Sequence, residues 1–125
     1  MIFGIGTDIV AVARMTEYYQ RHGERGLEKM LAPAEREACR TSSDPARFLA
    51  RRFAAKEALG KAFGTGVRAP VLLPDIAVEH DALGKPSFSY SPGLAAHFAE
   101  RGLDAHLSIS DERDYAVAFV ILEKP

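Results

Sequence analysis

The chain has 125 residues, of which 47% are hydrophobic and 26% are charged, as is usual for one soluble globular domain spanning residues 1–125. Its 16 Lys and Arg residues almost balance 17 Asp and Glu residues, and the net charge of −1 gives no general attraction to nucleic acid or to a membrane surface. Because no apolar run approaches the roughly 20 residues that a membrane-spanning helix needs, we expect neither nucleic acid nor membrane as a partner.

The first segment, residues 2–10, has the β-branched and aromatic residues that are typical of a strand. Gly4 and Gly6 interrupt it, and glycines inside a strand often mark a place where another backbone comes close. Asp8 is the one charged residue of this segment. Its carboxylate therefore needs a partner if it is buried, and a cation is one candidate.

Residues 14–21 are expected to form a helix that continues, with breaks at two glycines, to about residue 31. Arg14, Arg21 and Arg25 are separated by seven and four residues, so they share one helix face. Such a basic row is either an ordinary solvated surface or a docking surface for an acidic partner. The row alone does not decide between these two interpretations.

A short helix is expected to start at Pro33, followed by a polar loop over residues 41–45. Residues 47–63 form the most strongly predicted helix, because they are rich in Ala, Arg, Lys, Glu and Leu. Gly64 and Gly66 follow directly and act as stop signals.

The rest of the chain is expected to be mostly strands. A loop over residues 67–74 leads to strands at 75–80 and 87–90, and a helix over 92–101 begins with Ser91 as its cap. Residues 105–110 and 115–122 then form a hairpin. The fold class that follows is α+β: a single domain with an antiparallel sheet packed on a long central helix.

The charged residues of the long helix are placed unusually. On a helical projection Arg52 and Lys56 fall inside its apolar arc, Glu57 lies at the edge of the arc, and Lys61 lies just beyond it. The opposite side is rich in alanines, which allow close packing, so we expect this helix to be covered on more than one side. Charges near buried surface need partners.

Two interpretations of Glu57 and Lys61 remain open from the helix itself. They could form a salt bridge across one helical turn, which stabilises by only a few tenths of a kcal/mol. Alternatively, Asp8 and Glu57 could hold a divalent cation such as Mg²⁺, which often takes one or two carboxylates and leaves positions for substrate phosphates. In that case Arg52, Lys56 and Lys61 would supply the charge that attracts phosphate, and the backbone amides of residues 64–66 would bind it.

Other chemical motifs are absent. No nucleotide-binding P-loop occurs, the four histidines lack zinc-like spacing, and no serine sits in a nucleophile elbow. The single cysteine, Cys39, has no partner for an internal disulfide, and we interpret it as a packing residue. With no basic leader at the start of the chain, a reducing, cytoplasmic location is expected.

Two segments resemble the motifs of one family. The sequence GIGTDIV at residues 4–10, followed by Arg14, and the sequence RFAAKEALGKAFGTG at residues 52–66 are similar to the two signature motifs of the holo-acyl-carrier-protein synthases. The GKP sequence at residues 84–86 and the carboxy-terminal hairpin also match, so the resemblance covers essentially the full chain. Some members have a histidine where this chain has Asp111.

This resemblance implies a phosphopantetheinyl transferase fold and a magnesium-dependent enzyme, with Mn²⁺ as a possible substitute. The enzyme would transfer the phosphopantetheine of coenzyme A to a serine of an apo acyl carrier protein, in fatty-acid and possibly polyketide biosynthesis. The family also implies a homotrimer with active sites between subunits. The rival interpretations are a non-catalytic coenzyme A-binding module and a purely structural protein.

The resemblance assigns roles to individual residues. Asp8 and Glu57 would bind the metal, and Lys61 would lie beside the pyrophosphate. Glu57, or a metal-bound water that it holds, would take the proton from the attacking serine. Arg14 and Arg21 would bind the carrier protein. The residues that would bind coenzyme A are Arg52, Lys61, Gly64, Thr65, Gly66, Lys85, Pro86 and His106.

Overall fold

The computed structural model describes all residues from 1 to 125. Three strands, β1 (Ile2–Ala11), β5 (Tyr115–Glu123) and β4 (Asp104–Asp111), form an antiparallel sheet in the order β1-β5-β4. The strands β2 (Ile76–His80) and β3 (Pro86–Tyr90) form a separate antiparallel pair. The helices are α1 (Val12–Met30), α2 (Pro33–Arg40), α3 (Pro45–Phe63) and α4 (Pro92–Glu100), with a short 3₁₀ helix η1 at Leu73–Asp75.

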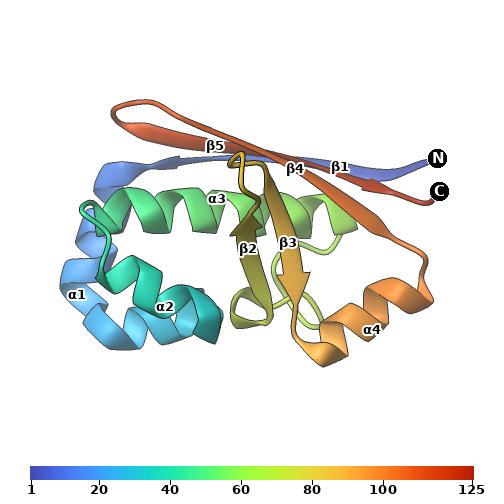
Figure 1. Ribbon diagram of the computed structural model, residues 1–125, viewed down its shortest axis with the longest axis horizontal. Helices are drawn as coiled ribbons and strands as arrows, with labels where there is room; N and C mark the ends of the chain where they lie inside the picture. The colour runs from blue at the N-terminus through green and yellow to red at the C-terminus, as the bar shows by residue number, and fades with distance from the viewer.

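Helix α3 is the centre of the molecule. It runs along one face of the three-stranded sheet, while α1, α2 and the β2–β3 pair lie on its other side (Figure 1). The side chains of Leu49, Ala54, Ala58 and Leu59 are fully buried, and all belong to one hydrophobic cluster of 24 residues. The prediction of an α+β fold with an antiparallel sheet on a long, multiply covered helix is confirmed.

The three-stranded sheet has one covered face and one open face. In β5, Ala116, Ala118 and Val120 are buried against α3, whereas the alternate residues Val117 and Phe119 are exposed. This alternation follows from the two-residue period of a strand. Because Asp8 has the same parity in β1 as the buried Gly6 and Val10, its side chain is directed toward α3 and not toward the open face.

The glycines of β1 let the strand approach α3 closely, as the sequence predicted. A Cβ atom at Gly4 would overlap the carbonyl oxygen of Ala62, and one at Gly6 would overlap that of Ala58. Only glycine has no Cβ atom, so these positions bring the backbone of β1 against one side of α3. That approach sets Asp8 beside the turn of α3 that contains Glu57 and Lys61.

Several element boundaries differ from prediction by one or two residues. Helix α3 starts at Pro45, because Asp44 caps it by accepting a 3.1 Å hydrogen bond from the backbone of Arg47. Helix α1 continues to Met30 across a kink at Gly23, where φ is 54°. Ser91 is the N-cap residue of α4 and Pro92 its first residue, as predicted, although the Ser91 side chain makes no capping hydrogen bond. None of the helices combines the length and apolar character needed to span a membrane.

Candidate active site

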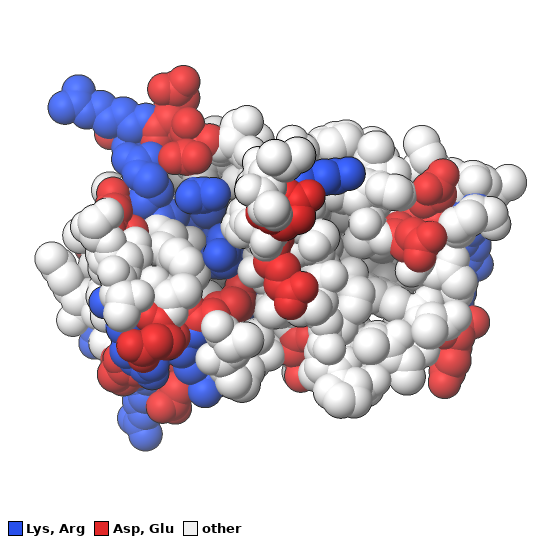
Figure 2. Space-filling view, in the orientation of Figure 1, with Lys and Arg blue, Asp and Glu red and all other residues white.

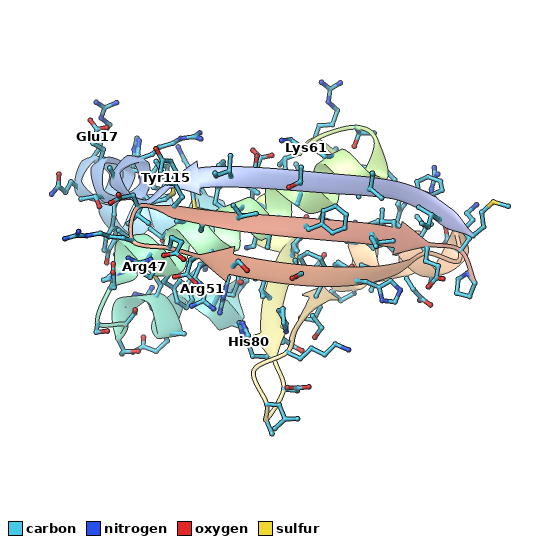
Figure 3. All side chains as sticks on the ribbon, turned by 90° about the horizontal axis from the view of Figure 1, so that it is seen from above. Glu17, Arg47, Arg51, Lys61, His80 and Tyr115 are labelled. Carbon is cyan, nitrogen blue, oxygen red and sulfur yellow. The ribbon has the colours of Figure 1, made fainter.

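Asp8 lies on β1, which is an edge strand of the sheet, and pairs in register with Ala118 of β5. Its side chain is 17% exposed. One carboxylate oxygen, Oδ1, accepts a 3.0 Å hydrogen bond from the Nζ of Lys61, which also donates to the backbone carbonyl of Thr7 at 3.0 Å. The lysine therefore connects α3 to the edge strand. Figure 3 shows Lys61 beside β1, at the edge of the sheet opposite to Arg51 and His80.

Lys61 forms its ion pair with Asp8, 53 positions earlier in the chain, and not with Glu57. The interpretation of Glu57 and Lys61 as a simple salt bridge along one helix is therefore wrong. Because Lys61 is 54% exposed, this pair contributes little to stability. The exposed ammonium group is instead accessible to an incoming anion.

Glu57 is partly buried and makes no hydrogen bond or ion pair with another side chain. Burial raises the pKa of its carboxyl group, and the nearby Asp8 carboxylate raises it further; Lys61 and Arg14 act in the opposite direction. A partly buried carboxylate whose ionisation a second carboxylate disfavours is a natural ligand for a cation.

The donor set fits a hard divalent cation. No group of three or more metal-binding side chains occurs in the chain. Asp8 and Glu57 could therefore supply two carboxylate ligands, and the remaining positions would go to water or to substrate. This is the pattern that Mg²⁺ shows when it binds through one or two carboxylates and substrate phosphates.

A cavity of approximately 340 Å³ lies beside the same stretch of α3, between α1 and η1. Arg14 and Arg21 line it together with Phe53 from α3, and the guanidinium of Arg14 lies 5.1 Å from the centre of the Phe53 ring. The cavity joins basic groups to an apolar floor. Its charge also reaches the carboxylates, since Arg14 lowers the pKa of Glu57.

The predicted basic row is only partly assembled on this cavity. Arg14 and Arg21 line it, but Arg25 does not, because the kink at Gly23 changes the direction of the helix between them. Glu17 also lines the cavity and reduces its positive charge. Figure 2 shows that charged side chains of both signs gather where α1 and α2 lie, whereas the other half of this face is mostly uncharged.

Lys56 and Arg52 are not part of the candidate site. Lys56 is completely buried and donates to Glu35 at 2.6 Å, while the Nε of Arg52 lies 3.1 Å from the other carboxylate oxygen of Glu35. The guanidinium of Arg52 also stacks 4.3 Å above the ring of Phe48. The prediction that Lys56 attracts phosphate is wrong, and the same contacts occupy Arg52.

The backbone amides of Gly64 and Gly66 form hydrogen bonds at the end of α3. The amide of Gly64 donates to the carbonyls of Gly60 and Lys61, and the amide of Gly66 donates to Gly60 at 3.0 Å. Gly64 has a φ of 101° and ends α3 in the left-handed conformation. These two amides therefore satisfy helix carbonyls, and the binding of coenzyme A by residues 64–66 stays a prediction.

The other residues predicted to hold coenzyme A lie apart from Asp8 within one chain. Lys85 lies in the turn between β2 and β3, where its amide donates to Asp81, and Pro86 is the first residue of β3. His106 is exposed on the open face of the sheet and forms a 2.9 Å hydrogen bond with Glu123. No hydrogen bond or ion pair connects any of these residues to Asp8, Glu57 or Lys61.

Sequence reasoning missed Glu35, which is 4% exposed and is the partner of both buried cations of α3. A signal was present. Arg52 and Lys56 in an apolar arc require a buried anion, and Glu35 is the third residue of a helix that begins with Pro33. Its carboxylate also accepts a hydrogen bond from the backbone of Ala32 at 2.9 Å.

Comparisons with known proteins agree on one family. A model of the 4′-phosphopantetheinyl transferase superfamily matches residues 4–120. The holo-[acyl-carrier-protein] synthase of Azoarcus sp. (strain BH72) is 60% identical over 123 residues, which cover 98% of each chain. That of Aromatoleum aromaticum is 56% identical over 124 residues, which cover 99% of each chain.

Solved structures give the same result for the fold. The crystal structure of holo-[acyl-carrier-protein] synthase from Neisseria meningitidis has a TM-score of 0.95 at 45% identity and covers 99% of this chain and 100% of that one. The Bacillus anthracis enzyme in complex with CoA (3′,5′-ADP) has a TM-score of 0.83 at 37% identity, over 100% of this chain and 99% of that one. The chain therefore belongs to the holo-[acyl-carrier-protein] synthases of the 4′-phosphopantetheinyl transferase superfamily.

Proposed function

We propose that this protein transfers the phosphopantetheine arm of coenzyme A to a serine hydroxyl of an apo acyl carrier protein and releases adenosine 3′,5′-bisphosphate. The observation that carries the proposal is the grouping of Asp8, Glu57 and Lys61 in a chain whose relatives are holo-[acyl-carrier-protein] synthases. A solved relative from Helicobacter pylori is described in complex with coenzyme A. A transferase of phosphate-linked groups needs charge neutralisation and positioning above all, and this group supplies both.

We assign the metal site to Asp8 and Glu57, with Mg²⁺ as the natural ion and Mn²⁺ as a substitute. The raised pKa of Glu57 beside a second carboxylate supports the assignment, because a divalent cation would relieve that unfavourable pairing. When bound, the ion would neutralise charge on the pyrophosphate of coenzyme A.

Lys61 would stabilise the leaving phosphate. Its ammonium makes two hydrogen bonds to β1 and is half exposed, so it can turn to an incoming phosphate oxygen. The carrier serine would attack the phosphorus nearer to pantetheine, which breaks the bond between that phosphorus and the bridging oxygen. Glu57 is our candidate for the base that takes the serine proton, because it has no other hydrogen-bond partner and its pKa is raised.

The cavity on α1 is the proposed docking site for the carrier protein. Arg14 and Arg21 would attract acidic side chains, and Phe53 would offer apolar contact surface. The cavity also lies against the turn of α3 that precedes Glu57, so a carrier bound there would present its serine to the candidate base.

We further propose a homotrimer in which neighbouring subunits complete each site. Ile5, Ile9, Val117 and Phe119 are exposed on the open face of the sheet, and Ile9 alone is 62% exposed. Such an apolar face favours burial against another copy. His106 lies on the same face, so it would hold coenzyme A in a neighbour's site rather than in its own subunit.

We propose that the remaining contacts with coenzyme A are likewise supplied by two neighbouring subunits. Lys61 would reach the pyrophosphate from the metal side, and Lys85 and Pro86 would contribute from the end of the β2–β3 turn and the start of β3. Thr65 would contribute through its exposed position after α3. Arg52 could take part only by leaving the carboxylate of Glu35.

The cellular setting that we propose is the cytoplasm, with the holo carrier protein used in fatty-acid biosynthesis. The buried, unpaired Cys39 fits a reducing compartment. Sensitivity of the purified protein to thiol oxidants, measured as loss of activity, would test how closely the fold depends on that condition.

A mass-shift assay tests the proposed reaction. The protein is mixed with coenzyme A, Mg²⁺ and an apo acyl carrier protein, and the carrier is weighed by mass spectrometry. We expect a gain of one phosphopantetheine that chelation of the metal prevents. Binding of coenzyme A with no gain across several carriers would favour a non-catalytic binding module, and neither binding nor gain would favour a structural protein.

A further inference from the structure

The charged residues buried behind α3 form one network around Glu35. One carboxylate oxygen, Oε1, accepts hydrogen bonds from Lys56 at 2.6 Å and from the backbone of Ala32 at 2.9 Å. The other, Oε2, accepts from the backbone of Val78 at 3.0 Å and lies 3.1 Å from the Nε of Arg52. A single carboxylate thus connects α2, α3 and β2.

Lys56 also holds two backbone carbonyls that belong to the walls of the docking cavity. Its Nζ donates to the carbonyl of Met30, the last residue of α1, at 2.9 Å. It donates to the carbonyl of Leu73, the first residue of η1, at 3.1 Å. Met30 and Leu73 both line the cavity, as does Phe53, which lies one turn before Lys56 and Glu57 on α3.

An apolar side chain could fill this space but could not replace those contacts. Lys56 is completely buried, so keeping an ammonium group here is costly in itself, although its ion pair with Glu35 offsets part of that cost. Replacing buried ion pairs by apolar residues is often neutral or stabilising. The two carbonyls of the cavity wall are therefore the contacts that an apolar residue at position 56 would leave without a donor.

We propose that Lys56 is a positioning residue for carrier-protein docking: its ammonium, held by Glu35, fixes the end of α1 and the start of η1 against α3, and so sets the cavity walls at a constant distance from Glu57. This inference depends on the proposed function, because it takes the cavity as the docking site. It assigns Lys56 no contact with coenzyme A, with the metal or with the reacting serine.

The test is steady-state kinetics of the full-length Lys56→Met variant, with carrier protein and coenzyme A varied separately. We expect the KM for carrier protein to rise roughly tenfold, as follows from losing donors to buried carbonyls, while the KM for coenzyme A stays within about twofold. Leu49→Ala is the matched control, because Leu49 is a fully buried residue of α3 that does not line the cavity. It should lower the Tm without changing the ratio of the two KM values.

The double variant Glu35→Gln with Lys56→Met separates positioning from stability. The double variant should recover part of the Tm that Glu35→Gln alone loses, because only one buried cation, Arg52, is then left without its carboxylate. The KM for carrier should stay high, because the carbonyls of Met30 and Leu73 still lack their donor. If Lys56→Met does not fold, this double variant and Glu35→Gln supply the comparison.

Three results are possible. A selective rise in the KM for carrier supports the proposal. An unchanged KM for carrier, or an equal rise for both substrates, would overturn it and leave the proposed function standing. If the unmodified protein itself modifies no carrier, the proposed function fails, and the proposal falls with it.

Discussion

Two neighbouring residues of α3 differ in how far their side chains are buried and paired. Lys56 is completely buried, and every donor position of its ammonium is used, by one carboxylate and two carbonyls. Glu57, the next residue, is only partly buried and has no side-chain partner. A structural charge is thus fully paired, whereas the candidate catalytic charge is left free for a ligand. An incompletely paired, perturbed carboxylate is the better indicator of a reactive site.

The comparison predicts its largest effect at the two carboxylates of the candidate metal site, Asp8 and Glu57. Asp8→Asn and Glu57→Gln should each lower turnover by about 10²–10³-fold or more, because each removes charge that acts on the reacting phosphate. Circular dichroism and thermal melts should show a folded protein with a nearly unchanged Tm. Glu79→Gln, at an exposed carboxylate of β2, is the control and should keep full activity.

The next largest effect is expected where β1 approaches α3 closely and so places Asp8 in the site. Gly6→Ala should lower the free energy of unfolding by about 1–3 kcal/mol, because the new Cβ would overlap the carbonyl of Ala58 and push β1 away from α3. Denaturant melts measure this change. Gly93→Ala is the matched control, since a Cβ there meets nothing within 4 Å, and its stability should be equal or higher. Equal loss in both variants would contradict the close approach.

A smaller effect is expected at the docking cavity. Arg14→Ala combined with Arg21→Ala should raise the KM for carrier protein several-fold at low salt, which corresponds to a loss of about 1 kcal/mol of electrostatic attraction. The KM for coenzyme A should stay nearly unchanged. The difference from the unmodified protein should shrink as salt increases. Arg25→Ala is the control, because the kink at Gly23 places Arg25 outside the cavity. A matching rise in that variant would show that the cavity is not the docking surface.

The smallest effect is expected in the pKa of Glu57, measured in the metal-free protein. Its folded-state pKa is raised, so its protonation stabilises the fold at low pH, and this contribution is lost as pH rises through the folded-state pKa. Nuclear magnetic resonance of the labelled carboxyl carbon should show a pKa above 4.5. Asp8→Asn should lower that pKa only in part, because burial is the larger cause. A pKa at or below 4.5 would remove our reason for choosing Glu57 as the base.

The sequence predicted the elements better than it predicted their contacts. Glycines and an isolated aspartate in the first segment indicated a strand with a close neighbour, and the structure has both features. The odd placement of Arg52 and Lys56 indicated buried charge correctly. The partner was missed, because Glu35 lies 21 positions from Lys56 and no local period connects them; its place in the first turn of α2 was the one signal that pointed to it.

The same limit applies to the candidate site. The spacing of four residues along a helix favoured a salt bridge between Glu57 and Lys61. Tertiary packing instead places Lys61 beside Asp8, with which it forms its ion pair. Likewise, glycines after a helix can cap it or bind an anion, and only the backbone angles decide which. Here Gly64 and Gly66 donate to the carbonyls of α3, so their amides serve the end of the helix.

The central claim is that Asp8 and Glu57 together hold the metal that acts on coenzyme A. Anomalous diffraction from crystals grown with coenzyme A and Mn²⁺ tests it most directly. We expect a manganese peak within bonding distance of carboxylate oxygens of both Asp8 and Glu57, and next to the pyrophosphate. Manganese bound at the pyrophosphate without either carboxylate, in an enzyme that is active with Mn²⁺, would contradict the assignment.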